Sequence, residues 1–289
     1  MISFSKLGSY GRLGNQLFQY AFLRESARRL GTSYYCPRWE GDDIFDLDDR
    51  LERAQQPIGI SRQFDGTTVA GFDVDALYIQ DSTEIRGYFQ SERFYQDRSI
   101  VRRWYKFKDS IIDAVDRKYP NELMQNAASF SLRIDDDYAN TREYFPLYPA
   151  SYYERGLRMA GDVDNVIVFA DRPDLAKEFF RRLPQLKIRV VRDLSAYEQL
   201  YLMTRCRFNI ITNSTFAWWG AWLNNQERHQ AIAPSHWCRP GVPRSIEGII
   251  SDEWTTVRGT IPVWDDFQLW RLRHPHRTMR RILDRIRRF

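Results

Sequence analysis

The sequence predicts an α/β protein whose C-terminal half is a doubly wound parallel sheet. Short apolar strands alternate there with helices of about ten residues, which is the pattern of βαβ units. Two segments, one in each half of the chain, indicate a strand, a tight Gly-rich or polar turn and the start of a helix. The backbone N–H groups at such a helix start bind anions. The sequence therefore predicts a cleft that grips a phosphate-bearing ligand.

The C-terminal half shows this alternation most clearly. Expected strands occupy residues 128–132, 165–169, 187–191, 208–211 and 230–233. Expected helices occupy residues 149–160, 175–180, 195–204 and 216–223. Ser195 and Glu198 form a capping box, which marks the start of the third of these helices.

The N-terminal half is less regular. Expected elements are strands at 2–4, 33–35 and 84–89, a helix at 16–30, a loop-rich acidic stretch at 40–49 and a turn or helix at 90–94. A polar stretch at 116–121 puts the expected domain boundary near residue 125. We therefore divide the chain into residues 1–125, 126–265 and a basic tail, 266–289.

Composition favours a globular protein of a reducing compartment. Hydrophobic residues make up 43% of the chain and aromatic residues 15%, which is enough for a core. Cys36, Cys206 and Cys238 are widely spaced and form no metal-binding or disulfide pattern. The N-terminus enters a strand at once, without the regions of a signal peptide, and no apolar run is long enough to span a membrane. We expect a cytoplasmic protein.

Polar residues gather where the predicted strands of the C-terminal half end. Arg133 follows one strand, Asp171 the next, Asp193 the third and the segment 213–215 the fourth. Ligands of doubly wound sheets bind at the carboxyl ends of the strands. The sequence therefore predicts that these residues surround one site.

Four segments between residues 8 and 237 carry a resemblance to a known family. They read GRLGNQLFQYA at 11–21, GYFQSERF at 87–94, NSTFAWWGAWL at 213–223 and APSHW at 233–237. Together and in this order they resemble the motifs of the family 11 glycosyltransferases, the α-1,2-fucosyltransferases. A fifth segment departs from that family, because residues 131–138 read SLRIDDDY where the family has H-x-R-R-G-D-Y. Its spacing is closer to the H-x-R-I-G-x-D-W of protein O-fucosyltransferases, and it retains Arg133.

The resemblance implies a GT-B architecture, in which two Rossmann-like lobes face one another. It implies that residues 126–265 bind the donor GDP-L-fucose and that residues 1–125 bind the acceptor. It also implies an inverting transfer without a metal or other cofactor, to O2 of a galactose in a surface-glycan oligosaccharide. The altered segment around Arg133 leaves two alternatives open: another GDP-deoxyhexose donor, or a catalytically silent subunit that binds a sugar nucleotide.

The resemblance assigns Arg133 to the donor phosphates, where a guanidinium stabilises the charge that builds up on the leaving GDP. The alternative is a structural ion pair with Asp137 or Asp171. Ser214 and Thr215 begin a helix and are expected at the β-phosphate, or as a plain N-cap. The resemblance adds Asn213 and Phe216 to the donor-binding residues.

Other candidates lie in the turns. Asp171 is expected either to accept hydrogen bonds from guanine or to cap the helix near residue 173. Asn15 is expected to bridge the phosphate and the acceptor hydroxyl, and Gly11 and Gly14 to permit turn conformations that a side chain would block. Trp218, Trp219 and Trp222 recur at helical spacing and are expected in the core.

The catalytic base is left open between Glu92 and Asp137, since an inverting transfer needs a group that reaches the acceptor hydroxyl. A mechanism in which the sugar departs first would need little from a base. The run Asp135–Asp137 is the one candidate for a metal site, and we interpret it as a solvated acidic turn.

The formal net charge of +5 arises in the tail, where eight arginines and one aspartate lie between Arg271 and Phe289. Apolar residues recur there at three- and four-residue steps, which indicates an amphipathic helix. One alternative is a helix on anionic lipid at the cytoplasmic face of the inner membrane, suited to a lipid-linked glycan acceptor. The other is a helix docked on the N-terminal lobe. Binding of nucleic acid would depend on this tail alone, and we do not expect it.

Overall fold

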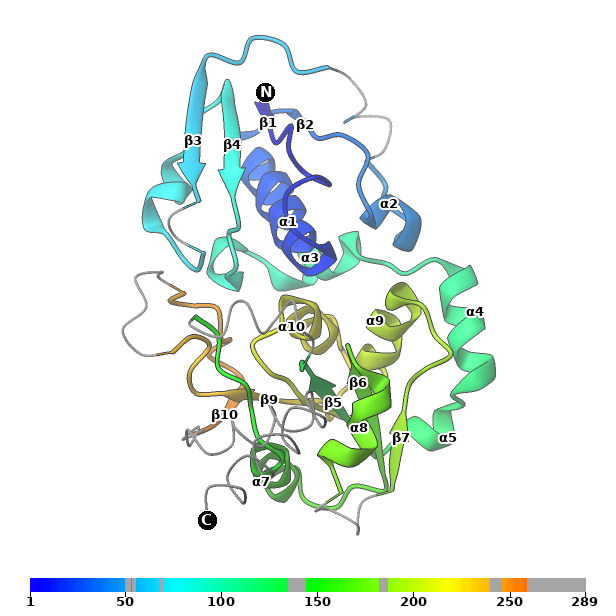
Figure 1. The fold of residues 1–289 in the computed structure, drawn as a ribbon. Coiled ribbons are helices and arrows are strands. Elements are labelled where there is room, and N and C mark those ends of the chain that lie inside the picture. The colour runs from blue at the N-terminus through cyan, green and yellow to red at the C-terminus, as the bar shows by residue number, and fades with distance from the viewer. Residues whose placement is uncertain are drawn as a thin grey trace, which may run out of the picture.

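The computed structural model describes residues 1–49, 53, 56–67, 70–134, 144–181, 187–239 and 246–258. Its elements form two lobes, each with its own parallel sheet (Figure 1). This confirms the predicted fold class, two α/β lobes facing one another. The tail from residue 259 onward and the acidic run at 135–137 lie outside the described residues.

The sheet of the N-terminal lobe has the order β2-β1-β4-β3, and every neighbouring pair of strands is parallel. Its strands are β1 (Ile2–Ser3), β2 (Tyr34–Tyr35), β3 (Arg62–Gly66) and β4 (Thr83–Gly87). Sequence analysis missed β3, because its residues are polar and mostly exposed and give no apolar pattern. Two 3-10 turns, Val74–Tyr78 and Glu92–Phe94, flank β4.

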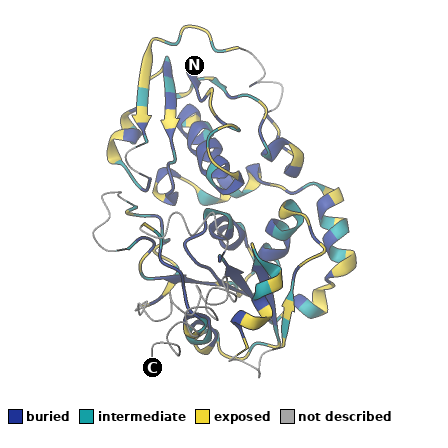
Figure 2. Cartoon of the chain, in the orientation of Figure 1, coloured by how far each residue is buried: buried dark blue, intermediate teal, exposed yellow. Residues whose placement is uncertain are grey.

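Helix α1 (Leu13–Leu30) is the central helix of this lobe and is buried over most of its length (Figure 2). It ends at Gly31, whose φ of +62° closes the last turn in the left-handed conformation. A short helix, α2 (Gly41–Ile44), lies in the stretch expected to be loop. The local sequence of α2 has two acidic residues near its start, which suit a helix N-terminus.

Three helices carry the chain from the first sheet to the second (Figure 1). They are α3 (Arg98–Trp104), α4 (Asp109–Lys118) and α5 (Asn121–Met124). Asp97 caps α3 by accepting hydrogen bonds from the backbone N–H groups of Ser99 and Ile100. The second sheet begins directly after α5, at Ala127.

The sheet of the C-terminal lobe has the order β10-β9-β8-β5-β6-β7 and is parallel throughout. Its strands are β5 (Ala127–Leu132), β6 (Asn165–Ala170), β7 (Ile188–Val190), β8 (Phe208–Ile210), β9 (Gln230–Pro234) and β10 (Thr255–Val257). Its helices are α7 (Ala150–Ala160), α8 (Pro173–Phe179), α9 (Ala196–Thr204) and α10 (Thr215–Trp222). The chain order reverses between β5 and β8, so this is the doubly wound sheet that the sequence predicts, with its ligand site expected at that reversal.

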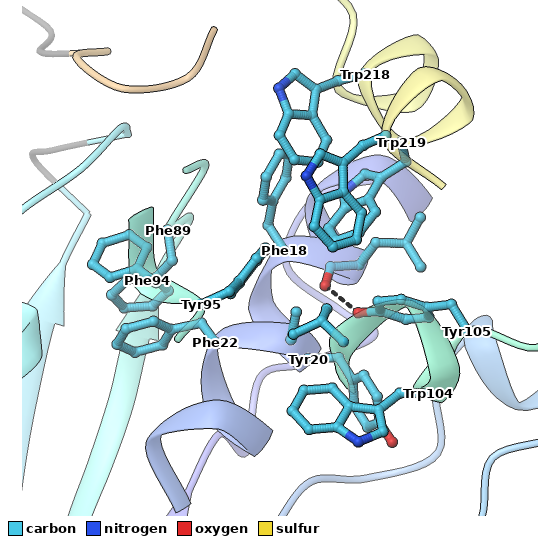
Figure 3. Close-up of a cluster of buried hydrophobic side chains, with 14 of the residues drawn as sticks. Phe18, Tyr20, Phe22, Phe89, Phe94, Tyr95, Trp104, Tyr105, Trp218 and Trp219 are labelled. Atoms are coloured by element: carbon cyan, nitrogen blue, oxygen red, sulfur yellow. Dashed lines mark hydrogen bonds between the residues drawn. The ribbon is translucent and has the colours of Figure 1, made fainter. Parts of the chain in front are cut away.

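One aromatic core joins the two lobes. Phe18 of α1 packs against Trp218 and Trp219 of α10, with ring centroids 4.5 and 4.9 Å apart (Figure 3). Tyr105 donates a hydrogen bond of 2.5 Å to the backbone carbonyl of Leu17. All three tryptophans of α10 are buried, which confirms that they belong to the core. Burial of aromatic side chains on this scale holds the lobes together.

Candidate active site

A cavity of about 450 Å³ opens at the carboxyl ends of β5, β6 and β8, where the N-terminus of α1 faces that of α10. The N-terminal lobe lines it with residues 12–15 and Glu40. The C-terminal lobe lines it with Ser131–Arg133, Phe169–Asp171, Ala196, Gln199, Met203 and Ser214–Phe216. The cavity therefore brings together the two turns that the sequence singled out, which lie some two hundred positions apart in the chain.

Arg133 follows β5 and lines this cavity beside Asp171. Its Nε lies 3.5 Å from Asp171 Oδ2, and both side chains are 19% exposed. Asp171 also accepts a hydrogen bond of 2.8 Å from the backbone N–H of Ile134. The ion pair with Asp171 that was weighed against a donor role is thus present. Because the pair itself lines the cavity, it orients the guanidinium there without removing it from a ligand's reach.

Asp171 does not cap the helix that follows. The N-cap of α8 is Arg172, and no side chain caps that helix. The capping alternative for Asp171 is therefore wrong, and its carboxylate fixes the start of the loop that carries Arg133 instead.

Helix α10 begins at the cavity. Ser214 is its N-cap, and its Oγ accepts a hydrogen bond of 3.4 Å from the backbone N–H of Ala217, so the capping alternative is confirmed. The first N–H groups of the helix have no partner within the helix and carry partial positive charge. Together with Arg133 they make the C-terminal side of the cavity attractive to an anion.

On the side of the cavity formed by the N-terminal lobe, Asn15 connects α1, the segment after β4 and α10. Its Oδ1 accepts hydrogen bonds from Gln90 Nε2 (2.9 Å) and from Thr215 Oγ1 (3.1 Å). The first joins α1 to the segment after β4, and the second joins the two lobes. The contacts fix the Asn15 amide at the cavity, where sequence analysis expects it to act.

Two glycines, Gly11 and Gly14, have no room for a side chain at the start of α1. A Cβ atom on Gly14 would lie 2.5 Å from the backbone nitrogen of Phe216 and 2.6 Å from Thr215 Oγ1. Gly11 has a φ of +87°, and a Cβ there would meet Asn15 at 2.8 Å. Gly14 thus permits the start of α1 to touch the start of α10, and Gly11 permits the turn before it.

Four expected residues do not line the cavity: Gly11, Asp193, Asn213 and Glu92. Asp193 instead accepts a hydrogen bond of 3.1 Å from Tyr119 OH. Asn213 is buried, and its Nδ2 donates hydrogen bonds to the carbonyls of Pro146 (3.0 Å) and Trp237 (3.2 Å), so it holds loops in place. Glu92 is also buried; it accepts from Trp222 Nε1 at 2.7 Å and pairs with Arg98 at 2.8 Å. The structure thus places Glu92 in the interface between the lobes, not beside a ligand. Asp137 lies outside the described residues.

Sequence analysis missed Glu40, which lines the cavity from the N-terminal lobe. Its Oε1 accepts from Gln16 Nε2 at 2.9 Å, and its Oε2 accepts from Tyr197 OH at 3.4 Å. Burial and, to a smaller extent, the charge of Glu40 raise the pKa of Tyr197, which keeps that hydroxyl a donor. The acidic stretch at 40–49 was the only signal of it in the sequence, and that signal does not distinguish Glu40 from its neighbours.

Three titratable groups that do not line the cavity, His229, Cys36 and Cys206, lie away from solvent to a large extent. Burial, aided by Arg102, lowers the pKa of His229 to about 4, so this imidazole is neutral near pH 7. Burial raises the pKa of the Cys36 thiol to about 12 and that of Cys206 further, so neither is a nucleophile. In the described ranges no three His, Cys, Asp or Glu side chains cluster as metal ligands would. Nor does any helix within those ranges combine the length and the apolar character of a membrane span.

Sequence comparison identifies relatives of the chain. Residues 161–258 match the model of glycosyl transferase family 11. The O-antigen biosynthesis glycosyltransferase WbnK of Escherichia coli is 25% identical, over 78% of this chain and 92% of that protein. An alpha-1,2-colitosyltransferase of Escherichia coli is 26% identical, over 78% of this chain and 90% of that protein. The C-terminal part of the chain thus resembles the family 11 glycosyltransferases, and the chain over most of its length is similar to two bacterial glycosyltransferases. The match agrees with the resemblance that the sequence motifs at 213–223 and 233–237 carry.

Solved structures share the fold of this chain. POFUT1 in complex with GDP-fucose superimposes with a TM-score of 0.54, at 11% identity, over 80% of this chain and 96% of that one. POFUT1 without ligand gives a TM-score of 0.55, at 12% identity, over 80% and 97%. At this level of identity the likeness concerns the arrangement of the two lobes.

Proposed function

We propose that this chain is an inverting glycosyltransferase that moves L-fucose from GDP-fucose to a glycan hydroxyl, O2 of a galactose. The observation that carries the proposal is the meeting of Arg133, the N-terminus of α10 and Asn15 in one cavity. A diphosphate is the ligand class that a guanidinium and a helix N-terminus recognise together. The similar structure of POFUT1 was solved with GDP-fucose bound, which supports this donor.

In the proposed reaction the acceptor oxygen forms a bond to C1 of fucose from the face opposite the phosphate. The bond from C1 to the phosphate oxygen breaks, and its electron pair leaves with GDP. The proton of the acceptor hydroxyl passes to a general base, for which Asp137 is the candidate that remains. Arg133 and the first N–H groups of α10 stabilise the negative charge that appears there. Asn15, held by Gln90 and Thr215, orients the acceptor hydroxyl. Orientation of this kind raises the rate because the reacting atoms are already in place.

A second donor, GDP-colitose, is favoured by two observations. One relative is named an alpha-1,2-colitosyltransferase. The segment around Arg133 also departs from the family pattern, and the structure shows where. Ser131, which stands at the position of the family's histidine, lines the cavity, and Ile134, at that of its second arginine, is buried in the core. Colitose is the 3-deoxy counterpart of fucose, so a smaller and less polar lining suits it.

Release of GDP tests the proposal. The purified chain is incubated with GDP-fucose or GDP-colitose, each with and without lactose as a galactose-terminated acceptor. Acceptor-dependent release with GDP-fucose supports the first donor, and release with GDP-colitose alone selects the second. Tight binding of GDP without turnover across a panel of donors and acceptors would instead support a silent sugar-nucleotide-binding subunit.

The acceptor belongs to the same proposal. One relative is named for O-antigen biosynthesis, which supports a surface glycan, carried on a lipid, as acceptor. The arginine-rich segment 271–289 supports contact with anionic lipid, because basic amphipathic segments bind such surfaces. Flotation of the full-length chain with anionic vesicles, compared with a chain that ends at Pro275, tests this contact. Equal flotation of the two would contradict it.

A further inference from the structure

Glu40 is a carboxylate in a cavity that otherwise favours an anion. It lines the same space as Arg133 and the start of α10, and its partners among the described residues are the neutral groups of Gln16 and Tyr197. Next to a diphosphate a negative side chain is unfavourable unless it binds hydrogen-bond donors of the same ligand. Glu40 therefore indicates that the ligand presents hydroxyl groups to it.

The position of Glu40 shows which part of the ligand this is. The diphosphate end of the cavity lies between β5 and β8, at Arg133 and Ser214. Strand β6 lies on the other side of β5. The end of β6 and helix α9 line the cavity there with mostly apolar side chains: Phe169, Ala170, Ala196 and Met203. An apolar lining of this kind suits a flat nucleobase.

Glu40 reaches across to this second end. Its partner Tyr197 is on α9, next to Ala196 in the lining, whereas its other partner, Gln16, adjoins Asn15 of the Gly-rich turn. Glu40 thus lies between the end that suits the base and the end that suits the diphosphate. In a nucleoside diphosphate, the group between base and phosphates is the ribose.

We propose that Glu40 binds the 2′- and 3′-hydroxyls of the donor's ribose. Each carboxylate oxygen has two acceptor sites, and the bonds from Gln16 and Tyr197 use one on each oxygen. One site on each oxygen then remains for the two hydroxyls of the diol. Carboxylates recognise ribose hydroxyls in this way in dinucleotide-binding folds. This assignment rests on the proposed function, since it takes a GDP-sugar as the ligand.

The same contact connects the lobes. Glu40 comes from the N-terminal lobe, whereas the proposed base and phosphate contacts come from the C-terminal lobe. A donor held by Glu40 is therefore gripped from both lobes. Because Tyr197 already ties Glu40 to α9, the carboxylate is held in place before the donor arrives.

Titration calorimetry with GDP and 2′-deoxy-GDP tests the assignment. We expect the wild-type chain to bind GDP about tenfold more tightly than 2′-deoxy-GDP, since a charge-assisted hydrogen bond is lost. Glu40→Gln should bind GDP more weakly and lose this preference. Asp43→Asn, which removes a nearby exposed charge that pairs with Arg38, should keep the preference.

Other outcomes overturn the assignment. If Glu40→Gln keeps the wild-type preference while its turnover falls by more than about a hundredfold, Glu40 acts on the acceptor proton instead. If the wild type binds GDP and 2′-deoxy-GDP equally tightly, the 2′-hydroxyl has no hydrogen-bond partner in the site. A wild-type chain that binds no GDP contradicts the proposed function as well. Should Glu40→Gln fail to fold, Glu40→Asp replaces it: the shorter carboxylate keeps the charge and should also lose the preference.

Discussion

The two lobes contribute different chemistry to the cavity that they share. The C-terminal lobe supplies positive charge, through Arg133 and the N-terminus of α10. The N-terminal lobe supplies the arginine Arg12, a glycine that allows close approach, an amide at Asn15 and a carboxylate at Glu40. On the proposed function, Arg133 and the N-terminus of α10 stabilise the leaving diphosphate, whereas Asn15 and Glu40 position the groups around it.

The contact between the lobes differs from the cavity in the side chains that form it. It is built from buried aromatic side chains, with Phe18 against Trp218 and Trp219 at its centre (Figure 3). Trp219 Nε1 also donates a hydrogen bond of 3.1 Å to the carbonyl of Gly14, which lines the cavity. The same helix thus packs the contact between the lobes with its body and offers its N-terminus to the ligand. Substitutions in the aromatic contact should therefore affect stability separately from substitutions at the N-terminus of α10, which should affect ligand binding.

The largest effect is expected at the positive side of the cavity. Arg133→Ala removes the cation at the leaving group and should lower kcat/KM for GDP release about 10³-fold, as loss of comparable groups does. Arg133→Lys keeps the charge but loses the planar, bidentate guanidinium. Its kcat/KM should therefore lie between those of the wild type and of Arg133→Ala. The measurement is GDP release at matched donor and acceptor concentrations, with circular dichroism to check the fold. Full activity in Arg133→Ala would remove the residue from the site.

A smaller effect, on stability and activity together, is expected where the lobes touch. Gly14→Ala puts a Cβ atom within 2.5 Å of the backbone nitrogen of Phe216, so α1 and α10 must separate. Overpacking of this kind costs about 1–3 kcal/mol of unfolding free energy. Urea denaturation measures it, and GDP release should fall as well, because Asn15 shifts with α1.

Gly31→Ala is the matched control for that change. Gly31 ends the same helix with a φ of +62°, but nothing lies within 4 Å of the Cβ it would gain. It should therefore cost only about 1 kcal/mol, through backbone strain, and leave GDP release unchanged. Equal loss of activity in both variants would mean that the closeness of the lobes at Gly14 does not matter.

A third prediction distinguishes a role of Glu92 in the contact between the lobes from a role in catalysis. Glu92→Gln removes the buried charge that pairs with Arg98 and accepts from Trp222 Nε1. We expect a loss of about 1–3 kcal/mol in unfolding free energy, because Arg98 loses its buried partner. The turnover of the folded enzyme should stay within about threefold of wild type, well short of the 10²-fold loss of a general base. A 10²-fold loss without destabilisation would restore Glu92 as the base.

The sequence predicts the C-terminal lobe better than the N-terminal lobe, for a physical reason. Strands of the C-terminal lobe such as β5 and β6 are buried along almost their whole length and appear as apolar runs, whereas β3 of the N-terminal lobe is largely exposed and does not. Strand β10 of the C-terminal lobe is exposed in the same way and was also missed. The sequence likewise predicts those site residues whose position follows from the strands. Arg133 and Ser214 are found because strand ends of one sheet converge.

Other parts of the site have no local signature. Glu40 takes its place through contacts with Gln16 and Tyr197, which are 24 and 157 positions away. The role of Asp171 likewise depends on a backbone N–H 37 positions earlier in the chain. Such contacts follow from the packing of the two lobes, and no pattern of neighbouring residues encodes them.

The smallest expected effect concerns pH and a group of the C-terminal lobe that does not line the cavity. His229 contacts Asn209 Oδ1 at 2.8 Å, and its pKa is lowered to about 4 by burial and by Arg102. The unfolded chain binds a proton at about pH 6.5, so it holds more protons than the folded chain between pH 6.5 and 4. Stability from this group is therefore complete above pH 6.5 and declines as the pH falls toward 4, by on the order of 1–2 kcal/mol after allowance for partial exposure.

His229→Gln isolates this contribution. Its side chain keeps a hydrogen-bond donor for Asn209 but cannot be protonated, so the urea midpoint of the variant should change less between pH 7 and pH 5 than that of the wild type. GDP release at pH 7 should be unaffected, since the imidazole is neutral there and does not line the cavity. If the variant lost stability toward pH 5 as steeply as the wild type, the acid sensitivity would have to arise from other groups.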